Sequence, residues 1–472
     1  MTSVRIESLD YEGRGVTHVD GKTIFVEGAI TGELVDYKSF HRKPNYEVAH
    51  MTRLHKESSQ RVTPPCEYFG TCGGCAMQHV SLVAQAAAKQ RVLEDAFGHI
   101  AKLRPEVMFP PISGEPWGYR HRARLSARHV AKKGGVLIGF REKRSSYVVM
   151  MDSCKVLPPR MSNLIVPLKN LIGAMAQPQQ FPQIEVAMGE GDTENKLTIV
   201  FVLRHLAPLT ENDQTLLRQF ADAHDVVWYL QAKGPDTVAL FYPTDAPSLA
   251  YRLPDFDIEV QFEPTEFTQV NPGVNRMLVR RAMMLLAPKA GERIADMFCG
   301  LGNFTLPIAQ LGAHVIGVEG SDALVRRAEK NARHNGLENR CEYQVANLFE
   351  ADAASLAALG KIDKMLIDPP REGADALVKA LPALDSGIDA PQRIVYVSCN
   401  PATLARDAAV LVHEKAYHLR GAGIASMFPH TAHVSRLRFS SDKKRSCGLL
   451  HSSALGNDSV LPAPTGELRY LP

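Results

Sequence analysis

Hydrophobic residues are spaced differently in successive regions of the chain. Residues 1–57 alternate short apolar runs with glycine turns, which predicts a small five-stranded β-barrel. Residues 106–265 are also β-rich, and the apolar runs 184–188 and 197–202 flank a polar turn, as in a hairpin. The one clear helix of this stretch is expected to begin at Thr210. The first half of the chain therefore predicts β structure.

The pattern changes at Asn271, an N-cap residue followed by proline at the first helical position. From there, helical patterns of about 10 to 15 residues separate short buried strands. The expected strands are 293–297, 314–318, 364–367 and 393–397. Alternating strands and helices predict a parallel, doubly wound α/β sheet, the Rossmann-like architecture.

Length and composition limit the class of protein. A chain of 472 residues is expected to form about three domains. No apolar run is long enough to cross a bilayer, and the first residues form no secretory signal. The eight cysteines are unevenly spread, which favours metal-binding or catalytic thiols in a reducing cytoplasm over a disulfide framework. A net charge of +3 is too small to indicate a nucleic-acid partner.

A glycine-containing loop follows the first of these strands, in the run 296–304. Gly300 and Gly302 allow the backbone to approach a ligand, and Glu319, after the next strand, suits a ribose diol. Asn303 stands where a dinucleotide fingerprint carries its third glycine. The loop therefore favours S-adenosylmethionine over NAD, although a tight strand–helix turn is the alternative interpretation.

Two later strand ends carry further candidate chemistry. Cys399 follows the expected strand 393–397, and Asp368-Pro369-Pro370-Arg371 directly follows the expected strand 364–367. A thiolate can add to an electron-poor carbon such as C6 of a pyrimidine. Enzymes that methylate exocyclic amines commonly carry an aromatic residue after Pro-Pro, where this chain has Arg371. The combination indicates methylation at carbon; the alternatives are a buried structural cysteine and a strand-terminating turn.

Four cysteines have the spacing of a metal site. Cys66, Cys72 and Cys75 lie in one loop, and Cys154 follows far downstream. Four thiolates suit either a tetrahedral zinc ion or a [4Fe–4S] cluster, and the spacing does not separate the two.

Basic residues are concentrated between positions 118 and 146, where nine of them accompany one acid, Glu142. They are Arg120, Arg122, Arg124, Arg128, Lys132, Lys133, Arg141, Lys143 and Arg144. We expect Arg120, Arg122 and Arg124 to share one strand face and to follow RNA phosphates. The alternative is an ordinary solvated charge run.

Taken together, these motifs resemble those of the RNA 5-methyluridine methyltransferases. The resemblance covers residues 1 to about 434 and is closest to the bacterial branch that carries an iron–sulfur cluster and acts on large-subunit (23S) ribosomal RNA. It rests on the segments 267–271, 296–304, 368–371, 398–401 and 428–434.

The resemblance implies a role for each matching residue. Cys399 would be the nucleophile that bonds to C6 of a flipped-out uridine. The S-adenosylmethionine pocket would be lined by Gln269, Phe298, Asn303, Glu319, Asn347 and Asp368. Cys66, Cys72, Cys75 and Cys154 would hold a [4Fe–4S] cluster, and the N-terminal barrel would be an RNA-binding TRAM module. The resemblance thus implies a cytoplasmic, monomeric RNA (uracil-C5)-methyltransferase with 23S ribosomal RNA as substrate.

Four regions are expected: the barrel (1–57), a central domain with the cysteine loop (58–265), the methyltransferase domain (266–434) and an atypical, disordered tail (435–472). In the family a glutamate that removes the C5 proton follows the His-Val pair; this chain has Ser435. The run 435–442 also lacks the expected apolar closing strand, as a reading-frame shift would produce. Three alternatives stay open: an RNA-binding protein with impaired turnover, a tRNA substrate, and cytosine methylation.

Overall fold

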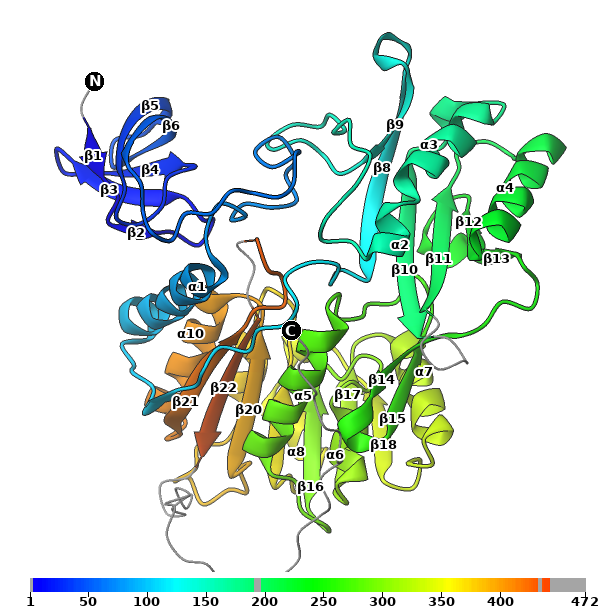
Figure 1. The fold of residues 1–472 in the computed structure, drawn as a ribbon. Helices are drawn as coiled ribbons and strands as arrows, with labels where there is room; N and C mark the ends of the chain where they lie inside the picture. The colour runs from blue at the N-terminus through cyan, green and yellow to red at the C-terminus, as the bar shows by residue number, and fades with distance from the viewer. Residues whose placement is uncertain (1–2, 191–196, 432–434, 442–472) are drawn as a thin grey trace, which may run out of the picture.

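Three sheets make up the protein in the computed structural model, which describes residues 3–190, 197–431 and 435–441. Figure 1 shows a blue N-terminal lobe and a cyan-to-green central lobe above a larger C-terminal α/β lobe. Within those described ranges, no helix combines the length and apolar character needed to span a bilayer.

The N-terminal lobe is a six-stranded sheet rather than the expected five-stranded one. Its strands are β1 (Val4–Arg5), β2 (Ser8–Leu9), β3 (Gly15–Val19), β4 (Lys22–Glu27), β5 (Leu34–Arg42) and β6 (Tyr46–Lys56), in the order β1-β5-β6-β4-β3-β2. Ile24 and Val26 alternate with more exposed neighbours along β4 and pack against Val35 and Ala49. The period-two pattern of the sequence therefore sets which face is buried.

The central lobe contains the predicted hairpin. The strands of its sheet are β8 (Arg122–Val130), β9 (Gly135–Gly139), β10 (Gln183–Glu190), β11 (Leu197–Arg204), β12 (Val226–Gln231), β13 (Val238–Tyr242), β14 (Leu249–Leu253) and β15 (Ile258–Phe262). The last two, β14 and β15, extend from this sheet into the C-terminal lobe (Figure 1). β10 and β11 pair antiparallel along their whole length, which confirms the hairpin. The path runs β13-β12-β11-β10-β14-β15, and β8 joins β10 to β9.

Helices cover one side of this central sheet. They are α2 (Pro159–Ser162), α3 (Ile165–Ala174) and α4 (Glu211–His224). Thr210 caps α4 as predicted, and Asp213 completes a reciprocal capping box. The expectation of a single clear helix was wrong, because α3 is a second helix in this stretch. The sequence did not predict α3, since no side-chain cap marks its start. Its sequence is apolar on most sides and so lacks the helical periodicity that would predict it.

A helix before the central sheet packs against the C-terminal lobe. α1 (Leu82–Ala96) begins at its N-cap Ser81 and continues into a π-helical turn (Phe97–Ala101). Leu93 and Phe97 share a hydrophobic core with the C-terminal sheet, and Figure 1 shows α1 beside α10. β7 (Val107–Met108) then pairs parallel with β21 at the edge of that sheet. The predicted domain boundaries stay a prediction.

The C-terminal lobe has the predicted doubly wound sheet. Its strands are β16 (Arg293–Met297), β17 (His314–Glu319), β18 (Cys341–Val345), β19 (Lys364–Ile367), β20 (Arg393–Ser398), β21 (His418–Ala425) and β22 (Ser435–Ser441). The order β18-β17-β16-β19-β20-β22-β21-β7 turns in both directions from β16. Its helices are α5 (Pro272–Leu286), α6 (Thr305–Gln310), α7 (Asp322–His334), α8 (Ala353–Ala357), α9 (Asp375–Ala380) and α10 (Pro401–Ala409).

Both faces of this sheet are buried, as a parallel sheet requires. Along β20, Ile394 and Tyr396 belong to one core, whereas Val395 and Val397 belong to the core on the other face. Asn271 caps α5 as expected, because its side chain accepts a hydrogen bond from the Val274 N–H. The β16–β20 strands thus end together at one carboxyl edge.

The expectation that the closing strand is lost was wrong. β22 lies between β20 and β21 and pairs antiparallel with both. The ladder needs only backbone groups, and Leu437 and Phe439 still alternate with polar residues in the sequence. Residues 435–441 of the predicted tail thus form a strand, and residues 442–472 lie outside the described residues.

Candidate active site

A cavity of about 760 Å³ opens at the carboxyl edge of the C-terminal sheet. All seven predicted cofactor and catalytic residues line it: Gln269, Phe298, Asn303, Glu319, Asn347, Asp368 and Cys399. Six of them lie at or after the ends of strands of this sheet, where open α/β sheets bind their ligands, and Gln269 lies just before α5. The structure thus brings the set together, and the role of each residue stays a prediction.

The loop after β16 is a close-turning segment. The N–H groups of Phe298 and Cys299 both donate to the Val318 carbonyl, which holds the loop against β17. Gly300 and Gly302 have φ values of +55° and +96°, a region that favours glycine. At Gly302 a Cβ atom would lie 3.2 Å from Cγ of Leu306. The two glycines therefore permit this turn, and their predicted role in letting the backbone approach a ligand stays a prediction.

Glu319 is held in place by backbone groups. Gly300 N–H donates to its Oε2 at 3.2 Å, and Ser321 N–H donates to its Oε1 at 3.1 Å. Each carboxylate oxygen can still accept a further hydrogen bond. A carboxylate fixed in this way beside the cavity is therefore suited to accept hydrogen bonds from the two hydroxyl groups of a ribose.

Asn303 has partners that sequence reasoning missed. Its Oδ1 accepts hydrogen bonds from Tyr251 Oη at 3.0 Å and from Asn275 Nδ2 at 2.9 Å. Tyr251 lies on β14, and Asn275 lies on α5. The amide is therefore oriented by two distant segments, and no local motif could have indicated either.

Aromatic side chains form much of the remaining wall. Besides Phe298, the cavity is lined by Tyr251, Phe267, Phe304, Phe349 and Phe428. Phe349 and Phe298 have ring centroids 5.7 Å apart. Among these residues, sequence reasoning assigned a site role only to Phe298. It assigned none to Phe267, Phe304 and Phe428, although they lie in segments that carry the resemblance.

Two carboxyl groups near the cavity have strongly shifted acidity. Burial raises the pKa of Asp368 to about 7. Burial also raises the pKa of Asp296 to about 7, although a hydrogen bond from Thr305 opposes the shift. Asp368 lines the cavity. A group with such a pKa changes charge near neutral pH, which is typical of functional sites.

Cys399 is exposed to the cavity at the end of β20. The turn that carries it is fixed on both sides. Asn400 N–H donates to Ser398 Oγ at 3.1 Å, and Asn400 Nδ2 donates to the Arg371 carbonyl at 3.1 Å. The second bond joins the cysteine turn to the Asp368–Arg371 segment. An accessible thiol on a fixed turn, facing the same space as Asp368, is suited to nucleophilic attack on a bound base.

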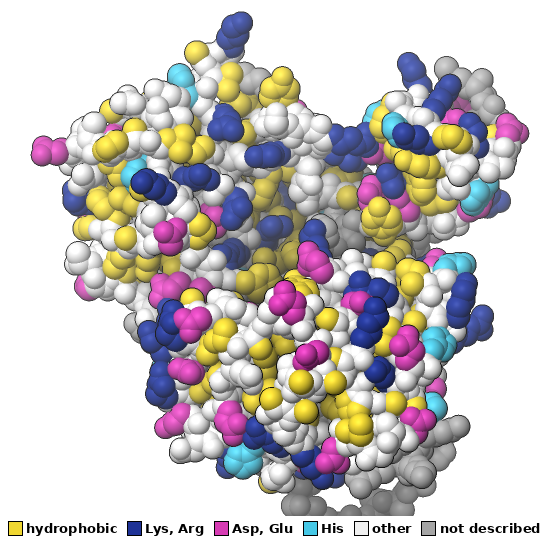
Figure 2. Space-filling model, turned by 180° about the vertical axis from the view of Figure 1, so that it is seen from behind, with side chains coloured by type: hydrophobic (Ala, Val, Ile, Leu, Met, Phe, Trp, Pro, Cys, Tyr) yellow, Lys and Arg dark blue, Asp and Glu magenta, His cyan; other side chains and the backbone are white. Residues whose placement is uncertain are grey.

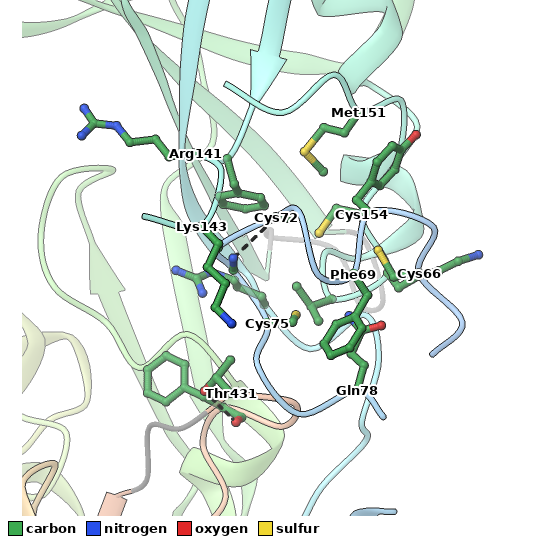
Figure 3. A pocket seen from close by; sticks show the side chains of 18 of the residues that line it. Cys66, Phe69, Cys72, Cys75, Gln78, Arg141, Lys143, Met151, Cys154 and Thr431 are labelled. Carbon is green, nitrogen blue, oxygen red and sulfur yellow. Dashed lines mark hydrogen bonds between the residues drawn. The ribbon is translucent and has the colours of Figure 1, made fainter. Parts of the chain in front are cut away.

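The four predicted metal-ligating cysteines line a second cavity, of about 640 Å³. Figure 3 labels Cys66, Cys72, Cys75 and Cys154 around it. The loop 66–75 is closed by hydrogen bonds such as Cys72 N–H to the Tyr68 carbonyl, and Cys154 N–H donates to Ser162 Oγ. Four thiols from two distant segments therefore face one space.

The donor set consists of four thiols, the ligand type of both zinc sites and iron–sulfur clusters. Within the described residues, no three His, Cys, Asp or Glu side chains are grouped closely enough to hold a single metal ion. A tetrahedral zinc site would hold its sulfur atoms about 3.8 Å apart, from Zn–S bonds of about 2.3 Å. Burial raises the pKa of Cys75 to about 12 and that of Cys154 to about 11. Thiols in such a place ionise only when a cationic group compensates for the burial.

The predicted phosphate track is only partly present. Arg122 and Arg124 share one face of β8, since Ala123 between them is buried, but Arg120 lies before the strand. Arg124 is paired with Glu185 at 2.8 Å. Burial lowers the pKa of Arg122.

Basic residues instead gather around the cysteine cavity. Its lining includes Arg120, Arg141, Lys143, Arg144, Lys155 and Arg371, with Glu142 the one acid among its lining residues. Figure 2 shows Lys and Arg side chains around the hollow where the lobes meet. Arg144 reaches the N-terminal lobe, where it pairs with Glu27 and lies 4.5 Å from the Phe40 ring centroid. This hollow is the candidate polyanion surface.

Comparison with known proteins finds uracil-C5 methyltransferases, both by family model and by individual relatives. A family model described as tRNA (uracil-5-)-methyltransferase matches residues 84–437. A protein of Aromatoleum aromaticum named 23S rRNA (uracil(1939)-C(5))-methyltransferase RlmD is 59% identical over 432 residues, covering 92% of this chain and 98% of that protein. A protein of the same name from Dechloromonas aromatica is 59% identical over 433 residues, with the same two coverages.

A solved structure matches the fold. The Pyrococcus abyssi tRNA (uracil-54, C5)-methyltransferase, in complex with S-adenosyl-L-homocysteine, superimposes with a TM-score of 0.68 and is 24% identical. The match covers 93% of this chain and 100% of that one. The Rossmann-like fold of the C-terminal lobe is thereby confirmed.

Proposed function

The chain belongs to the tRNA (uracil-5-)-methyltransferase family, and from that premise we propose that it methylates C5 of a uridine in 23S ribosomal RNA with S-adenosylmethionine. The observation that carries the proposal is the cavity in which Cys399, Asp368 and Glu319 meet at one sheet edge. Two relatives at 59% identity are named as 23S rRNA enzymes, which supports this substrate over tRNA.

The cofactor would lie along the strand ends. S-adenosylmethionine, when bound, supplies the methyl group on a positively charged sulfonium. Glu319 would accept hydrogen bonds from the ribose hydroxyls, and Asn347, after β18, would contact the adenine. Gln269, Phe298 and Asn303 would complete the pocket. Ionised Asp368 would face the cationic end of the cofactor, which its place in the cavity and its pKa near neutrality support.

Cys399 would carry the covalent chemistry. Its thiolate forms a bond to C6 of uracil, and the electron pair of the C5=C6 bond moves onto C5 and O4. C5 would then take the methyl group as the S–CH3 bond of the sulfonium breaks, which leaves neutral S-adenosylhomocysteine. When a base removes the C5 proton, the C6–S bond breaks and the thiolate is regenerated. The target uridine must first leave its stack to reach Cys399.

The base that removes the C5 proton in the last step is not identified among the residues of this chain that match the family. Ser435, the first residue of β22, replaces the glutamate that the family resemblance implies at that position, and a hydroxyl is a poor base at neutral pH. This observation favours a second candidate: an RNA-binding protein that forms the adduct but releases it slowly.

The cysteine cavity would hold a [4Fe–4S] cluster. Cys66, Cys72, Cys75 and Cys154 would be its ligands, because all four line one cavity and the family resemblance implies a cluster at these positions. The cluster would tie the loop 66–75 to Cys154, and the methyl transfer needs no redox step. An anaerobic preparation should be brown and contain iron and sulfide; a colourless protein with one zinc would refute this assignment.

RNA would lie in the basic hollow between the lobes. The N-terminal sheet would act as a TRAM-type RNA-binding module, in line with its place at the rim of that hollow (Figure 2). We further propose that the chain acts as a monomer in the cytoplasm, where ribosomal RNA is modified, with the domain boundaries given above.

Incubation of methyl-labelled cofactor with unmodified 23S ribosomal RNA, and in parallel with unmodified tRNA, tests the function, with nucleoside analysis of each product. We expect 5-methyluridine, or methylated RNA that stays bound to protein if release is slow. Methylcytidine, or label in tRNA only, would refute the assignment. The same RNA already methylated at the target serves as the control.

A further inference from the structure

The segment 427–431 forms a wall between the two cavities. Phe428 lines both the cofactor cavity and the cysteine cavity. Lys89 of α1, itself buried, donates a hydrogen bond to the Phe428 carbonyl at 3.0 Å. His430 is buried and has a φ of +63°, which residues other than glycine rarely adopt. Such a conformation persists only where the surroundings impose it, and it often marks a functional constraint.

The cysteine loop and α1 hold His430 through its backbone and ring. The N–H groups of Ala76 and Met77, directly after Cys75, both donate to the His430 carbonyl at 2.9 Å. Gln85 Oε1 accepts the His430 N–H at 2.9 Å, and its Nε2 lies 3.2 Å from the ring Nδ1. His430 is therefore bound directly to the residues that follow a candidate cluster ligand.

A third segment completes the contacts. The Trp117 and His430 rings are stacked, with centroids 3.8 Å apart and planes inclined by 15°. Tyr119 Oη donates to the Pro429 carbonyl at 3.0 Å. Three segments more than 300 residues away in sequence thus converge on two neighbouring residues.

We propose that His430 is a positioning residue for the methyl-transfer site. Its clamp by the cysteine loop, Gln85 and Trp117 fixes the place of Phe428 in the cofactor cavity. The cysteine loop therefore contributes to cofactor binding and methyl transfer through His430, without touching the reacting atoms. This inference rests on the proposed function for its account of turnover, but not for its account of cofactor binding.

The test uses the full-length, cluster-loaded protein and the variants Trp117→Ala, Trp117→Phe and Gln85→Ala. The affinity for S-adenosylhomocysteine is measured by calorimetry, and kcat and KM are measured with 23S ribosomal RNA. We expect Trp117→Ala and Gln85→Ala to weaken cofactor binding and to lower kcat by up to about 100-fold, the loss typical of a misplacement near 1 Å. KM for RNA should change far less. Trp117→Phe, which can still stack, should restore both quantities.

Arg91→Ala is the matched control, because Arg91 lies on the exposed face of α1 and pairs only with Asp95 among the described residues. It should behave as the unaltered protein does. Wild-type cofactor affinity in Trp117→Ala would overturn the proposal, and so would a loss that Trp117→Phe shares. If the unaltered protein binds the cofactor but methylates no RNA, the proposed function fails, and the affinities of the variants still decide the role of His430.

Discussion

Asp368 should make cofactor binding depend on pH near neutrality. Burial in the cavity raises the pKa of its carboxyl to about 7, so it is mostly protonated below that pH and mostly ionised above it. If the ionised form faces the cationic end of S-adenosylmethionine, the affinity rises with pH and levels off above the pKa. The ionised fraction falls about tenfold between about pH 8 and about pH 6, and the affinity should fall with it.

Isothermal calorimetry in buffers of different ionisation enthalpy measures both the affinity and the proton released on binding. At about pH 6 we expect close to one proton to be released per cofactor bound, and fewer as the pH rises. The variant Asp368→Asn should bind more weakly at high pH and lose the pH dependence. Because the pKa of Asp296 is also raised to about 7, this variant separates the two carboxyls. An unchanged pH dependence in Asp368→Asn would refute the reasoning.

Three further predictions concern the other parts of the site. Glu319→Ala should weaken cofactor binding by about 10-fold or more, since a half-buried charged hydrogen-bond acceptor is lost. Glu319→Gln should lose less, and equal affinity for Glu319→Ala and the unaltered protein would contradict the assigned role. Arg141→Ala should lower the salt dependence of RNA binding by about one counterion. Arg124→Ala should change this salt dependence less, because Arg124 is already paired with Glu185. A larger change in Arg124→Ala than in Arg141→Ala would contradict the location of the RNA surface. Cys75→Ser should lose iron and brown colour without changing the sequence of the RNA site methylated, and full iron content in this variant would exclude Cys75 as a ligand.

Local patterns in the sequence were sufficient for much of the C-terminal lobe. Four strands are buried apolar runs, and Asn271-Pro272 carries its own capping signal, so each could be predicted without knowing its neighbours. The candidate site followed, because parallel strands end at one edge and bring Glu319, Asp368 and Cys399 together.

The missed features depend on contacts between distant segments. β7 is two residues long and exists only because β21 offers it a partner. Tyr251 and Asn275 act through Asn303, which no local spacing reveals. The sequence wrongly predicted the loss of β22. This strand forms through backbone pairing with β20 and β21, and it needs no apolar run.

The bond between Cys399 and the pyrimidine can be observed directly with RNA that carries 5-fluorouridine. Fluorine at C5 cannot leave as a cation, so the covalent intermediate accumulates whether or not Ser435 slows release. With S-adenosylmethionine present, we predict a protein–RNA band that survives denaturing electrophoresis for the unaltered protein and is absent for Cys399→Ala. An adduct of equal yield in Cys399→Ala, or methylation of normal RNA by that variant at the wild-type rate, would contradict the account.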